Sequence, residues 1–385
     1  MVKKEEIMSK IPVKLRDKLL EIKAIFGIIR SKQKIQELNR AIESTDVSNW
    51  NNLNSDVDVW KRSLKKIALS TSVGFDIAIN FFNNDIQIIK TNKFKEININ
   101  SPIIICVVKN DLKRMKVFYD HYRKIGIEKF AILDNGSVDG TFEWLMSQED
   151  TDVYRTESLY TTNKRQSWIN KLISFYGFNK WYMVVDSDEL FVYQDMEKKT
   201  IQELTNLAIK KGYKRIRSIT LDMYSENPMF SDNEDSNYLS QYVYFDNDNY
   251  NYREHYAFRC IDGGMRVRMF RGENKGFAPY LTKYPLLYFE KGDLQYNSHY
   301  SFPIYKNFED VCWAGLMHYK FLSSDMKKYK EIAKSGAFYG GSYEYKQYIK
   351  LYNENKKRSF MHKNSKIYKN SHSLKYIKEI ERIKW

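Results

Sequence analysis

Residues 181–190 contain the side chains with the clearest chemical potential. An apolar stretch at 181–185 runs directly into Asp186 and Asp188, which are two positions apart. Alternate residues of a strand point to the same side of a sheet, so we expect both carboxylates to reach one divalent cation. In open α/β sheets ligands bind beyond the carboxyl ends of the strands, where this pair would lie. A polar turn after a strand accounts for the same residues without a metal.

A second carboxylate, Asp134, ends another apolar stretch. It is followed by a turn at 135–141 that is rich in glycine and short polar side chains, among them Asp139. At a strand tip, Asp134 could accept hydrogen bonds from a nucleotide base or ribose. An Asx-turn that leads into a helix cap also explains the segment without a ligand.

Both carboxylates require alternating strands and helices to position them. Continuous apolar residues predict buried parallel strands at 103–108 and 129–133, and the segment at 115–125 predicts a helix between them. A further helix at 163–175 precedes the apolar stretch at 181–185. Such alternation predicts an α/β fold with a Rossmann-like, mostly parallel sheet that is flanked by helices.

The chain divides into a main domain and two flanks. Apolar residues at helical spacing in the first 45 positions predict an N-terminal accessory region, mainly helical, over 1–98. The main α/β domain is expected over 99–322, and a basic, helical extension rich in Lys and Tyr over 323–385. A polar tract at 232–252 predicts a surface loop or hairpin, with a lid over the site as the alternative.

The net charge of +15 is spread unevenly along the chain. It amounts to +6 over 1–98 and +10 over 323–385, which leaves −1 for 99–322. A near-neutral main domain argues against a nucleic-acid groove in that domain. The basic flanks favour attachment to an anionic membrane surface, where each Lys or Arg contributes about 1 kcal/mol. A solvated, lysine-rich face is an alternative of equal weight.

Cysteine usage and hydropathy indicate the compartment. Cys106, Cys260 and Cys312 are widely separated and form no CxxC pair, which argues against a disulfide framework or a zinc site. The apolar run at 24–29 is too short for a membrane span. We therefore expect a cytoplasmic protein, either free or bound peripherally to the inner face of the membrane.

The order of motifs along the chain resembles the family 2-like bacterial glycosyltransferases, which adopt the GT-A fold and carry a DxD metal motif. The resemblance covers about 103–321, more than half of the chain. Its segments follow one another in this order: 107–111, 134–141, 186–190, 221–224, 263–270, 281–286, 298–300 and 317–321. The ordered series is far more specific than any one segment.

This resemblance implies transfer of a sugar from a nucleotide sugar, with a UDP-sugar as the preferred donor, to a glycan or lipid-linked acceptor in bacterial surface polysaccharide synthesis. The reaction would be aided by Mn²⁺ or Mg²⁺. By the same resemblance, Asp186 and Asp188 hold the metal and Asp134 holds the nucleoside. Asn110 and Asp139 are assigned to donor binding as well.

Basic side chains and histidines in the later motifs extend the expected site. Arg266, Arg268 and Lys283 are suited to grip phosphate oxygens, with surface ion pairs as the alternative for each. By the resemblance, His318 is the preferred additional metal ligand and His299 the second choice. An imidazole ligand would favour Mn²⁺ over Mg²⁺, whereas a hydrogen-bonded core histidine is the alternative.

An inverting transfer, which we favour, needs a carboxylate that takes the proton of the acceptor hydroxyl. Asp222 follows the predicted strand at 216–221 and is the preferred base. Glu189 and Asp262 are its rivals, and each could instead orient a neighbouring group.

Two other classes of function remain open. Nucleotidyl or phosphoryl transfer also uses paired carboxylates with Mg²⁺, although the chain has no phosphate-binding loop of the GxxxxGKS or GxxxxGKT type. The non-enzymatic alternative is a basic adaptor for membrane surfaces, which rests on the charge of the tail alone.

Overall fold

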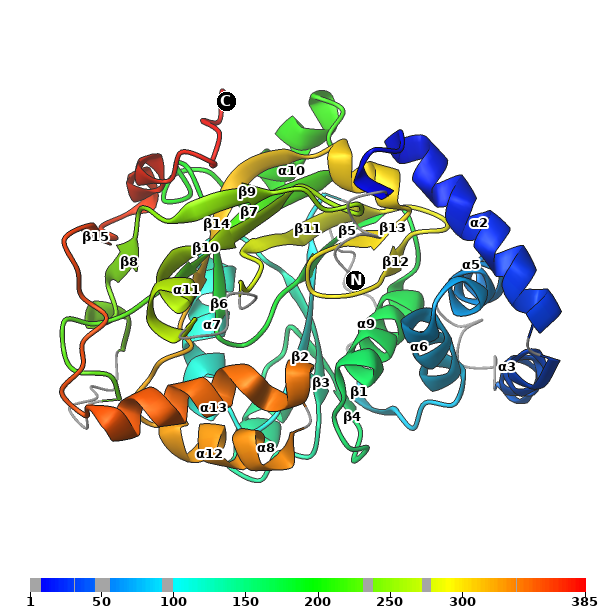
Figure 1. Ribbon diagram of the computed structural model, residues 1–385, viewed down its shortest axis with the longest axis horizontal. Coiled ribbons are helices and arrows are strands. Elements are labelled where there is room, and N and C mark those ends of the chain that lie inside the picture. Colours follow the sequence, from blue (N-terminus) through cyan, green and yellow to red (C-terminus); the bar gives the residue numbers. More distant parts are fainter. Residues whose placement is uncertain are drawn as a thin grey trace.

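The computed structural model describes residues 8–30, 32–45, 56–91, 100–230, 238–271, 278–336 and 338–385. Their architecture is α/β, with a large mixed sheet at the centre and helices around it (Figure 1). The predicted α/β class is thereby confirmed.

The first half of the sheet follows the predicted alternation of strands and helices. Its parallel strands are β2 (Ile103–Val108), β3 (Lys129–Asp134), β4 (Thr151–Arg155) and β5 (Lys180–Val184). The helices between them are α7 (Leu112–Lys124), α8 (Thr141–Met146) and α9 (Thr162–Tyr176). Almost every residue of these strands is buried. Burial on both faces explains the continuous apolar stretches of β2, β3 and β5. Strand β4, which the sequence analysis did not predict, is buried but contains Thr151, Asp152 and Arg155.

The second half of the sheet mixes strand directions. Its strands are β6 (Glu189–Tyr193), β7 (Arg215–Asp222), β11 (Thr282–Phe289) and β14 (Val311–His318), with α10 (Ile201–Lys210) between β6 and β7. Strand β11 runs antiparallel between β5 and β7, whereas β14 is parallel to β7 and antiparallel to β6. With β1 (Gln87–Lys90) antiparallel to β4, the order is β1-β4-β3-β2-β5-β11-β7-β14-β6. Six of these nine strands share one direction, so the sheet is mostly parallel.

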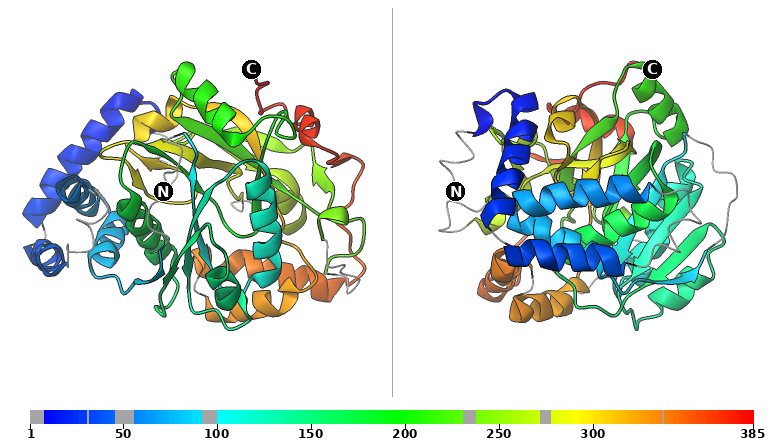
Figure 2. Two further views of the ribbon diagram at one scale, coloured as in Figure 1. Left: turned by 180° about the vertical axis from the view of Figure 1, so that it is seen from behind. Right: turned by 90° about the vertical axis from the view of Figure 1, so that its right-hand side faces the viewer.

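The N-terminal flank consists of helices that pack against one end of the sheet domain (Figures 1 and 2). They are α2 (Val13–Arg30), α3 (Lys32–Ser44), α5 (Val57–Ser70) and α6 (Ser72–Phe82). Trp60 of α5 stacks on Phe178 and Phe289, with ring centroids 5.0 and 6.1 Å apart. The flank therefore shares a hydrophobic core with the sheet. The expected boundary at residue 98 lies outside the described residues.

The C-terminal flank begins with α12 (Asp325–Ser335) and α13 (Tyr339–Glu354), which lie side by side at the lower edge of Figure 1. Beyond them follow β15 (Ser365–Ile367), which pairs with β8 (Tyr244–Asp246), and the 3-10 helix η3 (Ser371–Tyr376). Tyr348 and Phe360 join Phe321 in a buried aromatic cluster. The flank is thus helical as far as Glu354 and largely irregular after it.

Shorter elements complete the fold between β7 and β14. They are η1 (Tyr238–Ser240), β9 (Tyr250–Arg253), β10 (Cys260–Gly263), α11 (Gly264–Phe270), β12 (Leu294–Gln295), β13 (Ser301–Phe302) and η2 (Ile304–Phe308). The predicted loop or hairpin at 232–252 lies partly outside the described residues, and its described part contains η1, β8 and the start of β9. In the described ranges, no helix combines the length and the apolar character that crossing a membrane would require.

Candidate active site

Five strands that share one direction end at the same edge of the sheet. At or just beyond their carboxyl ends lie five residues that were predicted as site residues: Asn110 after β2, Asp134 in β3, Asp186 after β5, Asp222 in β7 and His318 in β14. The carboxyl ends of parallel strands are the usual place for ligands in open α/β sheets. The candidate site is therefore built at this edge.

Asp186 and Asp188 lie in a tight turn rather than on a strand. Strand β5 ends at Val184, and the backbone N–H of Glu189 donates to the carbonyl oxygen of Asp186 at 3.1 Å. Side chains alternate between two faces only while the backbone is extended. The expectation that both carboxylates lean to the same side rested on strand geometry, which does not apply to this turn.

The two carboxylates consequently have different partners. Asp186 pairs with Arg165 of α9 and with Lys283 of β11, whose Nζ lies 3.4 Å from Oδ2. Burial would raise the pKa of Asp186, but Arg165 and Lys283 outweigh it and lower the pKa. Asp188 instead faces His318, with 3.3 Å between Oδ2 and Nε2.

His318 lies between two carboxylates. While Nε2 faces Asp188, Nδ1 lies 2.7 Å from Oδ1 of Asp222. Strand register places His318 beside Asp222 on one side and Glu189 on the other. Potential ligand atoms of Asp188, Glu189 and His318 lie within 4.8 Å of one another. An imidazole whose other nitrogen donates to a carboxylate is the common arrangement of a metal ligand, so these residues fit a divalent cation.

The charges around His318 determine which way its hydrogen bonds run. Burial would raise the pKa of Asp222, but Arg266, whose Nε donates to Oδ2 at 2.9 Å, and His318 lower it to about 2. The ionised carboxylate can only accept, so Nδ1 carries the proton. Burial would lower the pKa of His318, but Asp188 and Asp222 raise it to about 8.

Asp222 has little capacity left for the expected role as a base. One oxygen accepts from His318 and the other from Arg266, and its low pKa makes it a weak proton acceptor. The geometry favours a role in which Asp222 orients His318.

The rival bases also have partners. Glu189 is 1% exposed, pairs with Lys283 and accepts a hydrogen bond from the backbone N–H of Asp186 at 3.1 Å. Asp262 of β10 lies 3.8 Å from Nη1 of Arg253. Glu189 is thus placed to hold the turn and Lys283, and its burial leaves its carboxylate almost without access to solvent.

His299 is a partly buried histidine that is bound to the backbone. Its Nδ1 lies 2.8 Å from the carbonyl oxygen of Thr282, and burial lowers its pKa to about 3. The ring is therefore neutral, and it is absent from the groups of potential metal ligands among the described residues.

Arg268 is separate from the other predicted cations. Its Nε and Nη2 each lie 2.9 Å from the carboxylate of Asp246, and Nη2 also donates to the carbonyl oxygen of Phe360 at 2.7 Å. Arg268 therefore joins α11 to the C-terminal flank. The same pairing neutralises Asp246, which otherwise groups with Asp248 and His362 as potential metal ligands.

Three charged residues of the site were missed by the sequence analysis: Arg165, Lys320 and Glu344. Glu344 of α13 lies 3.2 Å from Nη1 of Arg266 and 3.5 Å from Nζ of Lys320. Lys320 belongs to the motif at 317–321, so its position was an available signal. Arg165 and Glu344 carry no local signal, because their partners are far away in the chain.

A buried ionic network contacts the turn that contains Asp186 and Asp188. Ser187 donates to Asp111, and Asp111 lies 3.0 Å from Nη1 of Arg114. Arg114 also pairs with Asp325 of α12 and donates to the carbonyl oxygen of Tyr319 at 2.9 Å. One guanidinium thereby connects the turn, the segment after β14 and the C-terminal flank.

Asn110 and Asp139 connect the loops that follow β2 and β3. Asn110 has a φ of 50°, and its Oδ1 accepts from the N–H of Val138 at 2.8 Å. Asp139 accepts from the N–H groups of Leu112 at 3.2 Å and Thr141 at 3.0 Å. Both residues line a cavity of about 240 Å³ between the first turns of α7 and α12. Their position suits donor binding, although the backbone already uses much of their hydrogen-bonding capacity.

Asp134 is fully buried at the end of β3. Its Oδ2 accepts from the N–H of Ser137 at 3.0 Å and lies 3.7 Å from Nη1 of Arg155. No donor among the described residues reaches Oδ1. The turn shields Asp134 from solvent, so contact with a nucleoside would require the turn to open.

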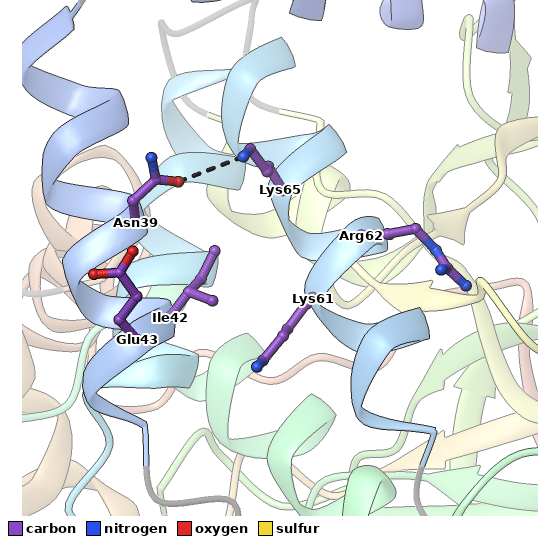
Figure 3. A pocket seen from close by; sticks show the side chains of 6 residues that line it. All are labelled: Asn39, Ile42, Glu43, Lys61, Arg62 and Lys65. Atoms are coloured by element: carbon purple, nitrogen blue, oxygen red, sulfur yellow. Dashed lines mark hydrogen bonds between the residues drawn. The ribbon is translucent and has the colours of Figure 1, made fainter.

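A separate hollow of about 190 Å³ lies between α3 and α5 (Figure 3). It is lined by Asn39, Ile42, Glu43, Lys61, Arg62 and Lys65. A hydrogen bond of 3.4 Å joins Lys65 to Asn39 across it. None of the residues predicted to perform chemistry lines this hollow, so we do not include it in the site.

No protein-family model matches the chain, and its sequence matches none of the curated proteins. An α/β fold of this class hosts many unrelated activities. The case for a function therefore rests on the side chains around His318.

Proposed function

We propose that this protein is a metal-dependent glycosyltransferase, which moves a sugar from a nucleotide sugar to a hydroxyl group of a glycan or lipid-linked acceptor. The observation that carries the proposal is the series Asp188, His318 and Asp222 at the carboxyl edge of the sheet. The fold is compatible with the proposal, because the large, mostly parallel sheet flanked by helices is Rossmann-like.

Asp188 and His318 would hold a Mn²⁺ or Mg²⁺ ion, and the imidazole favours Mn²⁺. When bound, the ion supplies a Lewis acid that offsets charge on the departing diphosphate. Asp222 keeps a proton on Nδ1, so Nε2, which faces Asp188, is the nitrogen that would offer its lone pair to the ion once its own proton has left. Arg266 holds Asp222 in place.

Cations around these carboxylates are suited to a diphosphate. They are Arg165, Lys283, Arg266 and Lys320. In the transfer, the oxygen of the acceptor hydroxyl bonds to the anomeric carbon and gives up its proton to water, while the bond from that carbon to the diphosphate oxygen breaks and the electron pair of that bond leaves with the nucleoside diphosphate. Guanidinium and ammonium groups stabilise this leaving group through charge-assisted hydrogen bonds.

The proposal is tested first with Asp188→Asn. We expect this variant to lose Mn²⁺-dependent release of nucleoside diphosphate from a panel of nucleotide sugars, because one metal ligand loses its charge. Asp150→Asn is the matched control, since Asp150 pairs with Arg123 on the surface at 2.7 Å. Full activity in Asp188→Asn, with the wild-type circular dichroism spectrum, would overturn the proposal.

The products separate sugar transfer from nucleotidyl transfer. A glycosyltransferase releases nucleoside diphosphate, whereas a nucleotidyltransferase releases pyrophosphate. Accumulation of pyrophosphate in the same assay would favour the second class.

A further inference from the structure

The carboxylate of Glu344 contacts the site from α13, a helix that follows the last strand of the central sheet in the sequence. Its Oε1 lies 3.2 Å from Nη1 of Arg266 and 3.5 Å from Nζ of Lys320, and it accepts from the hydroxyl of Tyr348. The side chains of Arg266 and Lys320 are only 8% and 12% exposed. Two nearly buried cations therefore share a single carboxylate oxygen.

Both cations belong to the candidate active site. Arg266 holds Asp222 through Nε, and Lys320 is two residues beyond His318. Lys320 thus lies just beyond the strand end that carries His318.

Glu344 presents to these cations the kind of oxygen that a phosphate presents. Arg and Lys side chains bind phosphate and carboxylate oxygens through the same charge-assisted hydrogen bonds. Burial would raise the pKa of Glu344, but Lys320 and Arg266 lower it to about 2. The carboxylate is therefore charged at every pH near neutrality, and protonation does not remove it from the cations.

The backbone before Glu344 is not a regular helix. Gly340, Gly341 and Ser342 have φ values of 61°, 66° and 61°, so the chain turns in the left-handed region just ahead of the carboxylate. Glycine adopts this region readily, whereas Ser342 does so at a cost. The position of Glu344 follows from this turn, where Gly340 and Gly341 have a wider choice of backbone conformations than other residues would have.

We propose that Arg266 and Lys320 form a binding position for a phosphate group of the donor diphosphate, and that Glu344 fills this position in the ligand-free protein and leaves it when the phosphate binds. The inference rests on the proposed function, because it takes the donor to be a nucleotide sugar. It goes beyond that function because it gives Glu344, and with it α13, a place in the donor site.

The test uses inorganic pyrophosphate as the probe, titrated calorimetrically into the full-length protein with and without Mn²⁺. Glu344→Gln removes the competing charge, so pyrophosphate should bind more tightly, by about tenfold if Glu344 occupies the position nine-tenths of the time. Glu354→Gln is the matched control, because Glu354 lies on the same helix, pairs with Lys350 at 4.0 Å and is half-exposed. It should bind pyrophosphate as the wild type does.

Lys320→Met should weaken pyrophosphate binding in the same assay. The inference is overturned if Glu344→Gln binds pyrophosphate no more tightly than the wild type. It is also overturned if Glu354→Gln increases the affinity for pyrophosphate as much as Glu344→Gln does, because the increase would then reflect only the change in net charge. If Glu344→Gln does not fold, Lys320→Met decides, since wild-type affinity in that variant also overturns it.

Failure of the proposed function has a different signature. In that case Mn²⁺ would not strengthen pyrophosphate binding, and Asp188→Asn would bind pyrophosphate as the wild type does. The inference alone would be overturned by a different pair of results. Glu344→Gln would bind pyrophosphate no more tightly than the wild type, while Mn²⁺ would still strengthen pyrophosphate binding in the wild type but not in Asp188→Asn.

Discussion

The proton on His318 competes with a metal ion for the same nitrogen. In the protein without metal, Asp188 and Asp222 overcome the effect of burial and raise the pKa of His318 to about 8. A metal ion binds the neutral ring, because Nε2 must offer its lone pair. The two carboxylates that make the site attractive to a cation thus also make it attractive to a proton.

We therefore predict that Mn²⁺ affinity rises with pH up to about 8 and levels off above it. Below the pKa of His318 in the folded protein, the imidazole must lose a proton before it can bind the ion. Each pH unit below that pKa therefore weakens Mn²⁺ binding about tenfold. Calorimetric titration of Mn²⁺ between pH 6.5 and 9 measures the effect. A flat profile would show that His318 is not a ligand.

Asp222→Asn provides the diagnostic variant for this prediction. Loss of the carboxylate charge lowers the pKa of His318, so the rise in affinity should move to lower pH, while the plateau falls about 10–100-fold because the ring is less well oriented. Saturating Mn²⁺ should restore most of the turnover. If turnover stays lost at saturation, Asp222 acts as the base after all.

At the scale of elements, the register of three strands creates the site. Strand β14 lies between β7 and β6, which places His318 beside Asp222 and Glu189 in neighbouring strands. The close fit of β14 depends on Gly315. A Cβ atom there would lie 2.7 Å from Cδ2 of Leu374 in η3 and 3.2 Å from Cδ1 of Leu221.

Gly315→Ala should destabilise the protein by about 1–3 kcal/mol, because the neighbouring side chains are buried and cannot yield without repacking. Thermal unfolding measures the loss. Leu374→Ala in the Gly315→Ala background should cost less than Leu374→Ala alone, since it makes room for the new methyl group. Additive effects of the two substitutions would contradict the packing argument.

At the scale of the whole molecule, the helices of the C-terminal flank contribute side chains to the site, whereas the flank as a whole also carries the basic charge. Its helices supply Asp325 to Arg114 and Glu344 to Arg266. Removing the chain from residue 323 onward would therefore remove parts of the site as well as the basic tail. A test of membrane attachment has to change surface charge without shortening the chain.

We predict that replacing Lys356, Lys357 and Lys363 by Gln weakens binding to vesicles that contain anionic lipid. These lysines are exposed beyond α13, and each contributes about 1 kcal/mol near an anionic surface. Co-sedimentation at low and high salt measures the effect, with neutral vesicles as the control. Equal binding of variant and wild type would assign the lysines to a solvated face. The melting temperature should not change.

The amino-acid sequence by itself determined which residues stand at the strand ends. Continuous apolar stretches identified β2, β3 and β5, because strands buried on both faces are mostly apolar, and the positions of Asp134 and Asp186 follow from where those stretches stop. The α/β class follows from the same pattern.

The tertiary structure alone decided how these residues are paired. The turn after Val184 directs Asp186 to Arg165 and Asp188 to His318, strand register joins His318 to Asp222, and packing of the C-terminal flank brings Glu344 into the site. Local patterns fix the direction of a side chain only relative to its own backbone. Which charge it meets depends on contacts between segments far apart in the chain, and these form only when the core has packed.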